Sequence, residues 1–513
     1  MGETSARRDD LPDALLRDME AKGVDAALTL SILGDFNAGL YDGVRPVRAR
    51  GVPAIDGESV VDLASGAPYH VAEGAARERL GALGLRVPEG LAREGGRLVF
   101  PRRELAALGL DLLPRAAYGI LNGGSATSYA DSKKNLAFGE GTFEALKPAF
   151  ESLAPLCKDR PKGISPAFVN PDGSPGPSFL ALKMRARLLA CAAYRARRGD
   201  PGCPILPLYQ MSSVGTDAQL AAAYAGYAAD PFLALPAASA GVAPCEVATG
   251  VQPMIAAYSH SSEGRPKRVF DRAYGAPDSV VALPGGHGQC FRILAPVLRA
   301  LRDSGVRFAW LGNVDNIGFL PDPVELALLA LSGRPAGFDF SLRTPMDVKG
   351  GILVEAEEGR TIADIGPAIS FDEVSRLEAA GSRILFNCAT GLFDLDWLVP
   401  RIEEIGRRLP VRFTDQDKDA GRYSQAEQVT WEVASLLPEF LAFAVEKSER
   451  FIAAKLLAET LLTSGVGAGD PRIPPELATT SASLRAGLER KLAGPCGLAL
   501  RGGRWMPAET PPA

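Results

Sequence analysis

Cysteine and histidine are scarce in this chain of 513 residues, and neither is arranged for its usual chemistry. The cysteines include no CxxC pair, and their number is odd. This pattern argues against a disulfide framework and a structural zinc site, and it favours a reducing compartment. The three histidines are His70, His260 and His287, and the seven cysteines stand at positions 157, 191, 203, 245, 290, 388 and 496.

Long apolar runs are missing as well. No uninterrupted run approaches the roughly 18 residues of a membrane span. The first residues, MGETSARRDDLPD, carry acids and no apolar core, so we expect no signal peptide. They match the bare start of a myristoylation pattern, but no second membrane signal accompanies it. We therefore expect a soluble cytoplasmic protein that makes no membrane contact.

An excess of positive charge is also absent. Lys and Arg total 56 against 61 for Asp and Glu, a formal net charge of -5. This balance predicts no broad surface for nucleic acid or an anionic membrane, so any bound anion must meet a local site. The hydrophobic fraction of 46% and the charged fraction of 23% are those of an ordinary soluble globular protein. The length fits several domains or one large α/β catalytic domain with appendages.

Several familiar catalytic motifs do not occur. The chain has no GxxxxGK[ST] loop, no GxSxG elbow, no HExxH and no complete GxGxxG fingerprint. Their absence weakens P-loop ATPase, serine hydrolase, zinc protease and nicotinamide dehydrogenase interpretations together.

The stretch LNGGSATSYADSKK, residues 121–134, is the most informative feature that is present. It follows a short apolar run at 116–121 and places Gly123 and Gly124 before Lys133 and Lys134. A strand that ends in a Gly-Gly turn lets backbone N–H groups approach a phosphate, and a nearby lysine supplies positive charge. The pattern predicts a nucleotide-phosphate loop. The alternative is a turn that only reverses the chain.

The apolar periodicity predicts alternating strands and helices. Helical spacing covers 10–23, 179–198, 218–228 after a cap at Thr216 and Asp217, and 289–303, while short apolar runs predict strands at 204–209, 279–283 and 307–311. This order indicates an α/β protein with a largely parallel sheet covered on both faces. Ligands of such sheets bind where loops leave the carboxyl ends of strands. The Gly-Gly loop, PGGHGQ and GNVDN all fall at predicted strand ends.

Outside this alternation of strands and helices, the apolar pattern is less regular, and it predicts the following elements. Residues 161–177 are rich in Pro and Gly and favour a long loop over the site. Residues 346–352 and 384–387 are predicted as strands, and 427–437 and 440–445 as helices, with helix continuing through SERFIAAKLLAETLL. We divide the chain into an N-terminal flank at 1–110, a catalytic domain at 111–464 and a short tail at 465–513.

Asp315 in GNVDNIG is the best candidate for a metal ligand. A carboxylate at a strand end between Asn313 and Asn316 suits Mg²⁺, which takes one or two protein carboxylates and completes its shell with water and phosphate oxygens. The alternative is an Asx turn, in which these side chains bond their own backbone.

Four other residues are candidates from their surroundings. His287 lies among glycines, where an imidazole would face a ligand, although a lone histidine is more often structural. Lys349 precedes two glycines and Lys455 lies in SERFIAAK, but most lysines are solvated surface charges. Asn387 ends an apolar strand, where its amide would bond a ligand hydroxyl or a turn.

Seven motifs occur along the chain in the order GGSATSYADSKK, PLYQMSSVGTD, PGGHGQ, NVDNIG, MDVKGG, FN and SERFIAAK. Taken in this order, they resemble the motifs of the UTP–glucose-1-phosphate uridylyltransferases, also called UDP-glucose pyrophosphorylases. The resemblance runs from about Asn122 to about Lys455. It implies a glycosyltransferase-A-like, Rossmann-like α/β core that binds UTP and a sugar 1-phosphate with Mg²⁺ as cofactor.

The resemblance also implies roles for individual residues. The residues expected to be catalytic are Lys134, Asp315, which also holds the metal, and Lys455. Those expected to bind UTP are Gly123, Gly124, Thr127, Lys133, His260 and Gly286. Those expected to bind the sugar phosphate are His287, Asn313, Asn316, Lys349, Gly350, Gly351 and Asn387.

The chain departs from the family pattern at several positions, and the glutamine usual for uracil recognition in the family corresponds to His260 here. GGLGT of the family is GGSAT here, so Ala126 replaces a glycine, and FNTNN is FNCAT. We therefore expect a uridylyltransferase that makes UDP-glucose and pyrophosphate from UTP and glucose 1-phosphate. The alternatives are another sugar 1-phosphate, such as that of an N-acetylhexosamine or galactose, a non-catalytic sugar-nucleotide sensor, or a dinucleotide-binding oxidoreductase.

Overall fold

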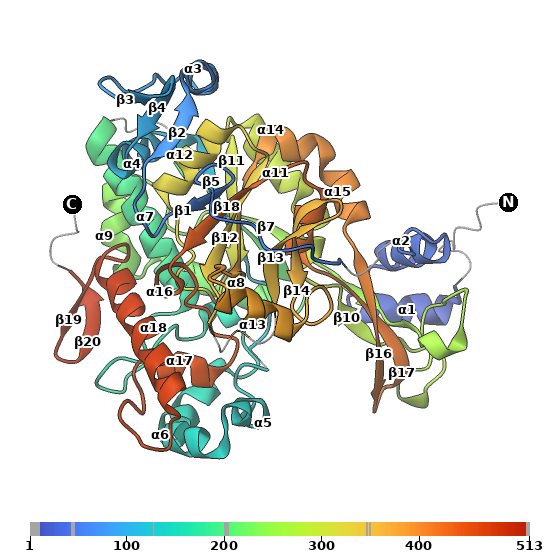
Figure 1. Ribbon diagram of the computed structural model, residues 1–513. Helices are drawn as coiled ribbons and strands as arrows, with labels where there is room; N and C mark the ends of the chain where they lie inside the picture. Colours follow the sequence, from blue (N-terminus) through green and yellow to red (C-terminus); the bar gives the residue numbers. More distant parts are fainter. Residues whose placement is uncertain are drawn as a thin grey trace.

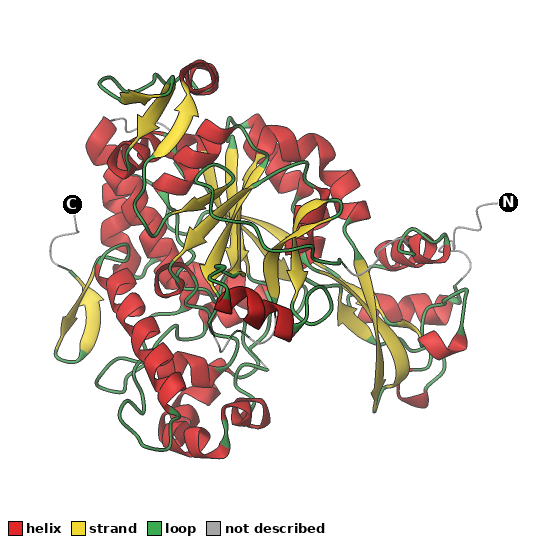
Figure 2. Ribbon diagram, in the orientation of Figure 1, coloured by secondary structure: helices red, strands yellow, loops and turns green. Residues whose placement is uncertain are grey.

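A ten-stranded central sheet organises the protein (Figures 1 and 2). The structure is a computed structural model that describes residues 11–42, 47–126, 128–199, 205–344, 347 and 350–508. The strand order is β1-β18-β12-β15-β11-β5-β6-β7, and β13 with β14 extends from β15. The strands are β1 (Val60–Asp62), β5 (Ala116–Leu121), β6 (Leu208–Ser213), β7 (Val247–Gln252), β11 (Phe308–Asn313), β12 (Ala336–Leu342), β13 (Gly351–Ala356), β14 (Gly359–Asp364), β15 (Leu385–Asp394) and β18 (Leu441–Val445).

The sheet is mostly parallel, as the sequence predicts. β5 pairs in parallel with β11 on one side and β6 on the other, and β18 pairs in parallel with β1 and β12. β15 lies between β11 and β12 and is antiparallel to both. Because of this reversal, the start of β15 lies at the edge of the sheet where its parallel neighbours end.

Both faces of the sheet are covered by helices. In β5, Tyr118 and Ile120 pack into one apolar core, and Ala117 and Leu121 pack into the other. This alternation follows from the period of two along a strand. The first core includes α3 (Glu73–Ala82), α4 (Arg102–Asp111), α6 (Glu140–Cys157), α7 (Phe179–Arg198), α8 (Asp217–Ala228), α9 (Pro231–Ala240), α12 (Pro323–Ser332), α17 (Leu457–Thr463) and α18 (Pro475–Ala493), and the second includes α10 (Cys290–Ile293), α11 (Ala295–Asp303), α14 (Leu395–Leu398) and α15 (Ile402–Arg408).

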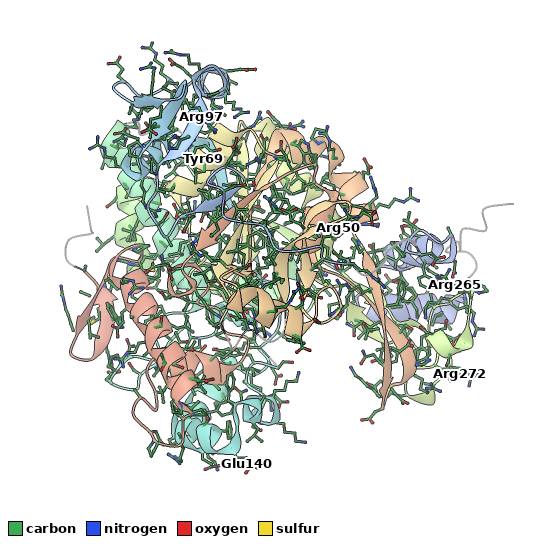
Figure 3. The ribbon with its side chains drawn as sticks, in the orientation of Figure 1. Arg50, Tyr69, Arg97, Glu140, Arg265 and Arg272 are labelled. Carbon is green, nitrogen blue, oxygen red and sulfur yellow. The ribbon has the colours of Figure 1, made fainter. Side chains whose placement is uncertain are left out.

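Three smaller units project from this body. The β16–β17 lobe, at the right of Figures 1 and 3 with Arg265 and Arg272, has its own core around Leu15, Met19 and Tyr258. A three-stranded sheet with Tyr69 and Arg97 lies at the top, and a hairpin ends the described chain. The lobe contains α1 (Asp13–Ala21), α2 (Ala26–Asn37), β8 (Met254–Ala256), β9 (Tyr258–Ser259), β10 (Ala282–Pro284), β16 (Val411–Lys418) and β17 (Gly421–Gln428); the other units are β2 (Tyr69–Ala72), β3 (Ala92–Glu94), β4 (Arg97–Phe100), β19 (Leu498–Arg501) and β20 (Arg504–Pro507).

Two predicted elements are wrong. The run at 279–283 does not join the parallel sheet, because β10 pairs with β8 in a separate antiparallel pair. The segment 440–445 is a strand, β18, rather than a helix. Its five buried residues, LAFAV, form a short apolar run, and periodicity alone does not separate a buried strand from a buried helix in such a run.

Other boundaries are shifted. The predicted helix at 289–303 is interrupted at Leu294, and a new helix begins at Ala295 with Pro296 in its first turn. The predicted helix at 427–437 is the end of β17 followed by a 3-10 helix, Thr430–Leu436. Between α16 (Lys447–Arg450) and α17 the chain is not helical. Two further helices are α5 (Ser132–Asn135) and α13 (Phe371–Ala379).

The predicted domain boundaries remain predictions. β1, from the predicted N-terminal flank, pairs with β18 at the edge of the central sheet. In the part of the chain that the structure describes, no helix is long and apolar enough to cross a membrane.

Candidate active site

The candidate site lies where the loops after β5, β11 and β18 meet the start of β15. β5 and β11 are paired along their full length, so the glycine loop after Leu121 and the loop after Asn313 leave the sheet side by side. Gly312 also pairs with Thr390 of β15. This edge holds most of the residues that the motifs single out, in agreement with the rule that ligands of parallel sheets bind at the carboxyl ends of strands.

The glycine loop is held by a distant segment of the chain. The Lys162 N–H donates to the Gly124 carbonyl at 3.0 Å, and the Ala126 N–H donates to the Arg160 carbonyl at 2.8 Å. Gly163 packs on the buried Asn122, and a Cβ at residue 163 would lie 2.3 Å from Asn122 Oδ1. A side chain at residue 163 would therefore have to displace the buried Asn122 side chain, which lies directly after β5.

Lys162 forms an ion pair with Asp315. Its Nζ lies 2.6 Å from Asp315 Oδ2, and the two side chains are 13% and 15% exposed. The Nζ also lies 4.9 Å from the centroid of the Tyr129 ring, close enough for a cation–π contact. A cation and a carboxylate at the mouth of a glycine loop can together bind a phosphate and the metal ion that accompanies it.

Lys455 lies on a segment that runs alongside Asp315. The Ala454 N–H donates to the Asp315 carbonyl at 3.3 Å, and the Ile317 N–H donates to the Ile452 carbonyl at 3.0 Å. Lys455 itself is exposed, and its backbone N–H donates to Glu459 Oε2 at 2.6 Å. The structure therefore brings together the predicted residues Asp315 and Lys455.

His287 is fixed as a neutral hydrogen-bond donor. The Thr430 N–H donates to His287 Nδ1 at 3.1 Å, and the Thr430 hydroxyl donates to the His287 carbonyl at 2.9 Å. Because Nδ1 accepts a hydrogen bond, the proton of the neutral ring is on Nε2. Burial, the largest cause, and the charge of Lys455 together lower the pKa of His287 to about 4, although the charge of Asp315 opposes both. The ring can thus donate one hydrogen bond to an anionic ligand without being charged.

The depressed pKa of His287 predicts a pH-dependent stability. The histidine of the unfolded chain binds a proton near pH 6.5, whereas the folded protein resists protonation down to about pH 4. The free energy of unfolding should therefore fall as the pH drops below 6.5, by at most about 1.4 kcal/mol per pH unit from this group. Urea unfolding at pH 7, 6 and 5 measures it, with His287→Gln as the comparison because all other titrating groups are shared. A pH-independent difference between the two proteins would contradict the assignment.

The glycines of the two loops have different surroundings. Gly286 has a φ of +81°, and a Cβ there would lie 2.3 Å from the Gln428 carbonyl oxygen, so it is required by packing. Gly123 is half-buried and accepts a hydrogen bond from Ser213 Oγ at 2.9 Å. Gly124 is exposed, and a Cβ on it would meet nothing within 4 Å. Gly124 thus leaves the backbone open to a ligand.

The two asparagines beside Asp315 differ in accessibility. Asn313 is half-buried at the end of β11. Asn316 is 1% exposed, and its amide is used within the protein, since Nδ2 donates to the Arg450 carbonyl and Oδ1 accepts from the Gly318 N–H. Because both ends of its amide are hydrogen-bonded within the protein, Asn316 has a structural role in this loop.

The predicted sugar side gathers around Phe386. Gly350 has a φ of +138°, and a Cβ there would lie 2.5 Å from the Phe386 ring. The next residue of the strand, Asn387, accepts a hydrogen bond from the Ala389 N–H at 3.0 Å through Oδ1, and Ala389 has a φ of +53°. Gly351 begins β13 beside them. Thr127 and Lys349 were also predicted to bind ligand, and both lie outside the described residues.

Three of the predicted residues have no described contact with the cluster formed by Asp315, Lys162, Lys455 and His287. Lys134 is exposed on α5 and donates a hydrogen bond to Ser128, and Lys133 is exposed beside it. His260 accepts from the Ser262 N–H at 3.1 Å and lies 3.6 Å from Asp415. β9, just before His260, pairs with β17 at Ser424. Gln428, which contacts the His287 loop, is four residues further along β17, or about 13 Å at 3.3 Å per residue.

Two residues that sequence reasoning missed complete the site. Lys162 lies in the Pro- and Gly-rich segment that was predicted only as a loop over the site, and Thr430 lies in a segment predicted to be a helix. The sequence did contain a signal for Lys162, because this lysine stands between Pro161 and Gly163 in a stretch of turn residues. Such a charge does not belong to the solvated face of a helix or strand, where most lysines lie. No local pattern distinguishes Thr430.

The donor set suits a metal ion that arrives with a phosphate ligand. Among the residues the structure describes, no group of three or more His, Cys, Asp or Glu could hold a metal ion. Asp315 offers one partly exposed carboxylate. Mg²⁺ is commonly bound by one or two carboxylates together with water and phosphate oxygens, so this site fits Mg²⁺ bound to a nucleotide.

Part of the chain matches the model of a known protein family. Residues 269–465 match the model of the UTP–glucose-1-phosphate uridylyltransferase family, and this match confirms the resemblance predicted from the motifs. No curated protein matches the chain significantly in sequence.

Solved structures of UDP-sugar pyrophosphorylases share the fold. The UDP-N-acetylglucosamine pyrophosphorylase of Trypanosoma brucei is similar over 95% of this chain and 88% of its own, with 15% identity and a TM-score of 0.58. The UDP-glucose phosphorylase of the same organism is similar over 90% and 80%, with 18% identity and a TM-score of 0.52. A UDP-glucose pyrophosphorylase mutant of Leishmania major, in complex with UDP-glucose, is similar over 88% and 79%, with 16% identity and a TM-score of 0.51.

Proposed function

We propose that this protein is a uridylyltransferase that makes UDP-glucose and pyrophosphate from UTP and glucose 1-phosphate in the cytoplasm. One observation carries the proposal. The Lys162–Asp315 ion pair, the Lys455 segment and the neutral His287 gather beside the open backbone of Gly124. Two cations and a hydrogen-bond donor around a glycine loop suit a reaction between two phosphate groups.

The proposed reaction needs positioning and charge neutralisation more than proton transfer. An oxygen of the sugar phosphate attacks the α-phosphorus of UTP, the bond from that phosphorus to the bridging oxygen breaks, and pyrophosphate leaves with the electron pair. The attacking oxygen is already anionic, so no general base is required. Lys162 neutralises the triphosphate oxygens, Lys455 brings the sugar phosphate into line, and the His287 Nε2–H donates to a phosphate oxygen.

Asp315 is the residue that would hold Mg²⁺. When bound, Mg²⁺ supplies positive charge to the triphosphate and the leaving pyrophosphate. Lys162 lies against the same carboxylate, so the ammonium group would move toward the triphosphate oxygens when the nucleotide binds. Lys134 and Lys133 were the lysines predicted from the sequence to neutralise the triphosphate, and they remain candidates for that role. Kinetics of the Lys162→Met and Lys134→Met variants distinguish them.

Glucose 1-phosphate is the first sugar substrate to test, and N-acetylhexosamine or galactose 1-phosphate are the alternatives. Proteins named for both UDP-glucose and UDP-N-acetylglucosamine share this fold. The FNCAT segment lies where β15 begins, with a buried Cys388 and the positive φ of Ala389 beside Asn387. The side chains that surround a sugar there are smaller than the asparagines of the family pattern.

A panel of sugar 1-phosphates with UTP and Mg²⁺, scored by pyrophosphate release, tests the function directly. We expect release with glucose 1-phosphate and less with the N-acetylhexosamine and galactose 1-phosphates. Release with another sugar alone would change the substrate but keep the reaction. Binding of UTP or UDP-glucose in calorimetry without release from any sugar would instead support the sensor alternative.

Gly124→Ala tests whether the triphosphate lies against the glycine loop. The new methyl group meets no protein atom within 4 Å and Gly124 has no positive φ, so stability should change little. If a phosphate oxygen lies against this backbone, the methyl group should raise KM for UTP about tenfold, a loss of about 1.4 kcal/mol. Steady-state kinetics measures it.

Gly226→Ala in α8 is the matched control, since its added methyl group also meets nothing within 4 Å. It should leave KM unchanged. An unchanged KM in both variants would place the triphosphate away from Gly124.

A further inference from the structure

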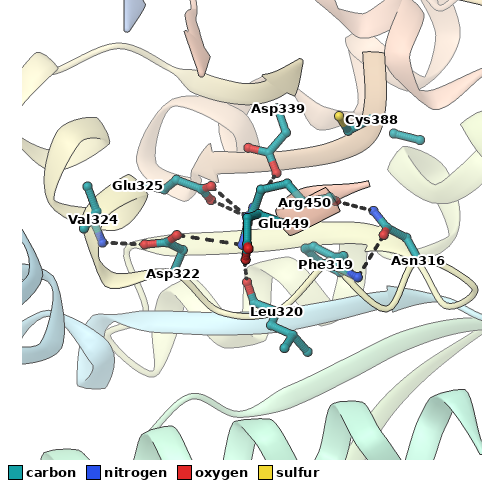
Figure 4. Close-up of polar contacts among 12 residues, drawn as sticks. Asn316, Phe319, Leu320, Asp322, Val324, Glu325, Asp339, Cys388, Glu449 and Arg450 are labelled. Carbon is teal, nitrogen blue, oxygen red and sulfur yellow. Dashed lines mark hydrogen bonds and ion pairs between the residues drawn. The ribbon is translucent and has the colours of Figure 1, made fainter. Parts of the chain in front are cut away.

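We propose that Arg450 is a positioning residue that couples Asp315 to Lys455, an inference that rests on the proposed function of those two residues. Arg450 ends α16 and precedes the segment that carries Lys455. It meets the loop after Asp315 through both its side chain and its backbone (Figure 4).

The guanidinium group joins three elements in the protein interior. It donates to Asp339 Oδ2 of β12 at 3.0 Å, to Glu325 Oε2 of α12 at 2.8 Å and to the Leu320 carbonyl at 3.1 Å (Figure 4). Asp322 lies 3.8 Å away. The Arg450, Glu325 and Asp339 side chains are 7%, 2% and 3% exposed. This cluster fixes α16 relative to the loop that ends at Leu320.

The backbone of Arg450 bonds the same loop. Asn316 Nδ2 donates to the Arg450 carbonyl at 2.9 Å, while Asn316 Oδ1 accepts from the Gly318 N–H at 3.0 Å. A Cβ at Gly318 would lie 2.6 Å from the Arg450 carbonyl carbon, so the two chains are in close contact. The chain after Arg450 then runs beside Asp315 through the bonds of Ile317 and Ala454 described above.

A role in stability alone does not explain this arrangement. A buried ion cluster is weak evidence for stability, because apolar side chains of similar volume often serve as well. Burial raises the pKa of Glu325 well above its ordinary range, so this carboxylate is costly to keep charged in the interior. What apolar side chains would not reproduce is the alignment of the Asp315 loop with the Lys455 segment, and small displacements of catalytic groups are costly.

Asn316→Ala is the decisive variant, because it keeps the guanidinium and its carboxylates but removes the link to the Arg450 carbonyl. We expect kcat to fall at least about thirtyfold, with KM for UTP and for glucose 1-phosphate within about threefold of the wild type. If Asn316 bound the sugar phosphate directly, KM for that substrate would rise with kcat preserved, and this outcome would overturn the proposal.

Arg450→Met tests the guanidinium itself, with Arg187→Met as its matched control. Arg187 is another buried arginine, 2% exposed on α7, and it donates to the Leu206 carbonyl at 2.7 Å. Both variants lose a buried guanidinium, but only Arg450→Met should lose kcat at a temperature where both are folded. Arg450→Lys should recover part of it. Equal kcat values in the two methionine variants would overturn the proposal. If Arg450→Met does not fold, the kcat of Asn316→Ala decides whether the proposal holds.

Hydrogen exchange separates this inference from the proposed function. In Asn316→Ala, the amides of Ile317 and Ala454 should exchange at least about tenfold faster than in the wild type, while those of β5 stay unchanged. This result does not depend on turnover. A wild-type protein without pyrophosphate release would contradict the function alone, whereas unchanged protection of both amides would overturn the coupling.

Discussion

Replacing Lys162 by methionine should lower kcat/KM for UTP by about a hundred- to a thousandfold. The ammonium group lies against Asp315, and the backbone of the same residue bonds the glycine loop. A preorganised charge of this kind contributes most when charge builds on the leaving group. Methionine keeps the approximate length of the side chain but removes the charge, and with it the cation–π contact with Tyr129. Pyrophosphate release at saturating glucose 1-phosphate measures the loss.

Lys134→Met is the matched control for this prediction. Lys134 follows the same glycine loop in sequence, but it is exposed and bonded to Ser128. Its replacement should change kcat/KM by less than about threefold, an effect typical of an exposed charge. A large loss in Lys134→Met with near-normal activity in Lys162→Met would return the role to the lysine predicted from the sequence.

The regular elements around the site could be predicted because they are long and strongly patterned. β5 and α7 occupy the predicted residues 116–121 and 179–198. The predicted strand at 307–311 is β11, and Asp315 follows it. Each depends on local information: a fully apolar run between turn residues, or apolar side chains on one helical face. The Gly-Gly loop and GNVDN were both predicted at strand ends, and they leave the same edge of the sheet because β5 and β11 are parallel neighbours.

The remaining parts of the site depend on contacts between segments far apart in sequence. Lys162 reaches Asp315 because residues 160–162 pair with the glycine loop, and no local pattern of that Pro-rich segment encodes the pairing. His260 resembled a ligand in sequence order, yet β9 carries it into the β16–β17 lobe. The PGGHGQ loop follows a short strand outside the central sheet, and contacts with β17 and Thr430 hold it instead.

Asp315→Ala should lower turnover by at least about a hundredfold while leaving the protein folded. The carboxylate is partly exposed at a loop, so its removal creates no buried cavity, and the backbone bond from Ala454 remains. Its loss should remove the proposed Mg²⁺ ligand and the partner of Lys162 together, with a rate loss of about a hundredfold or more. Lys455→Ala should have a comparable effect, because the attacking phosphate loses its cation. Near-normal activity in either variant would remove that residue from the mechanism.

A double substitution distinguishes the two roles of Asp315. If the carboxylate serves only to orient Lys162, the double variant Lys162→Met/Asp315→Asn should be no slower than Lys162→Met alone. The reason is that the rate losses of two residues that act as a unit do not add. If Asp315 also holds Mg²⁺, the double variant should lose a further factor of ten or so and require more Mg²⁺ for half-maximal rate. We expect the second result, because Mg²⁺ bound with a nucleotide still needs one protein carboxylate. Equal Mg²⁺ requirements in the single and double variants would limit Asp315 to orienting Lys162.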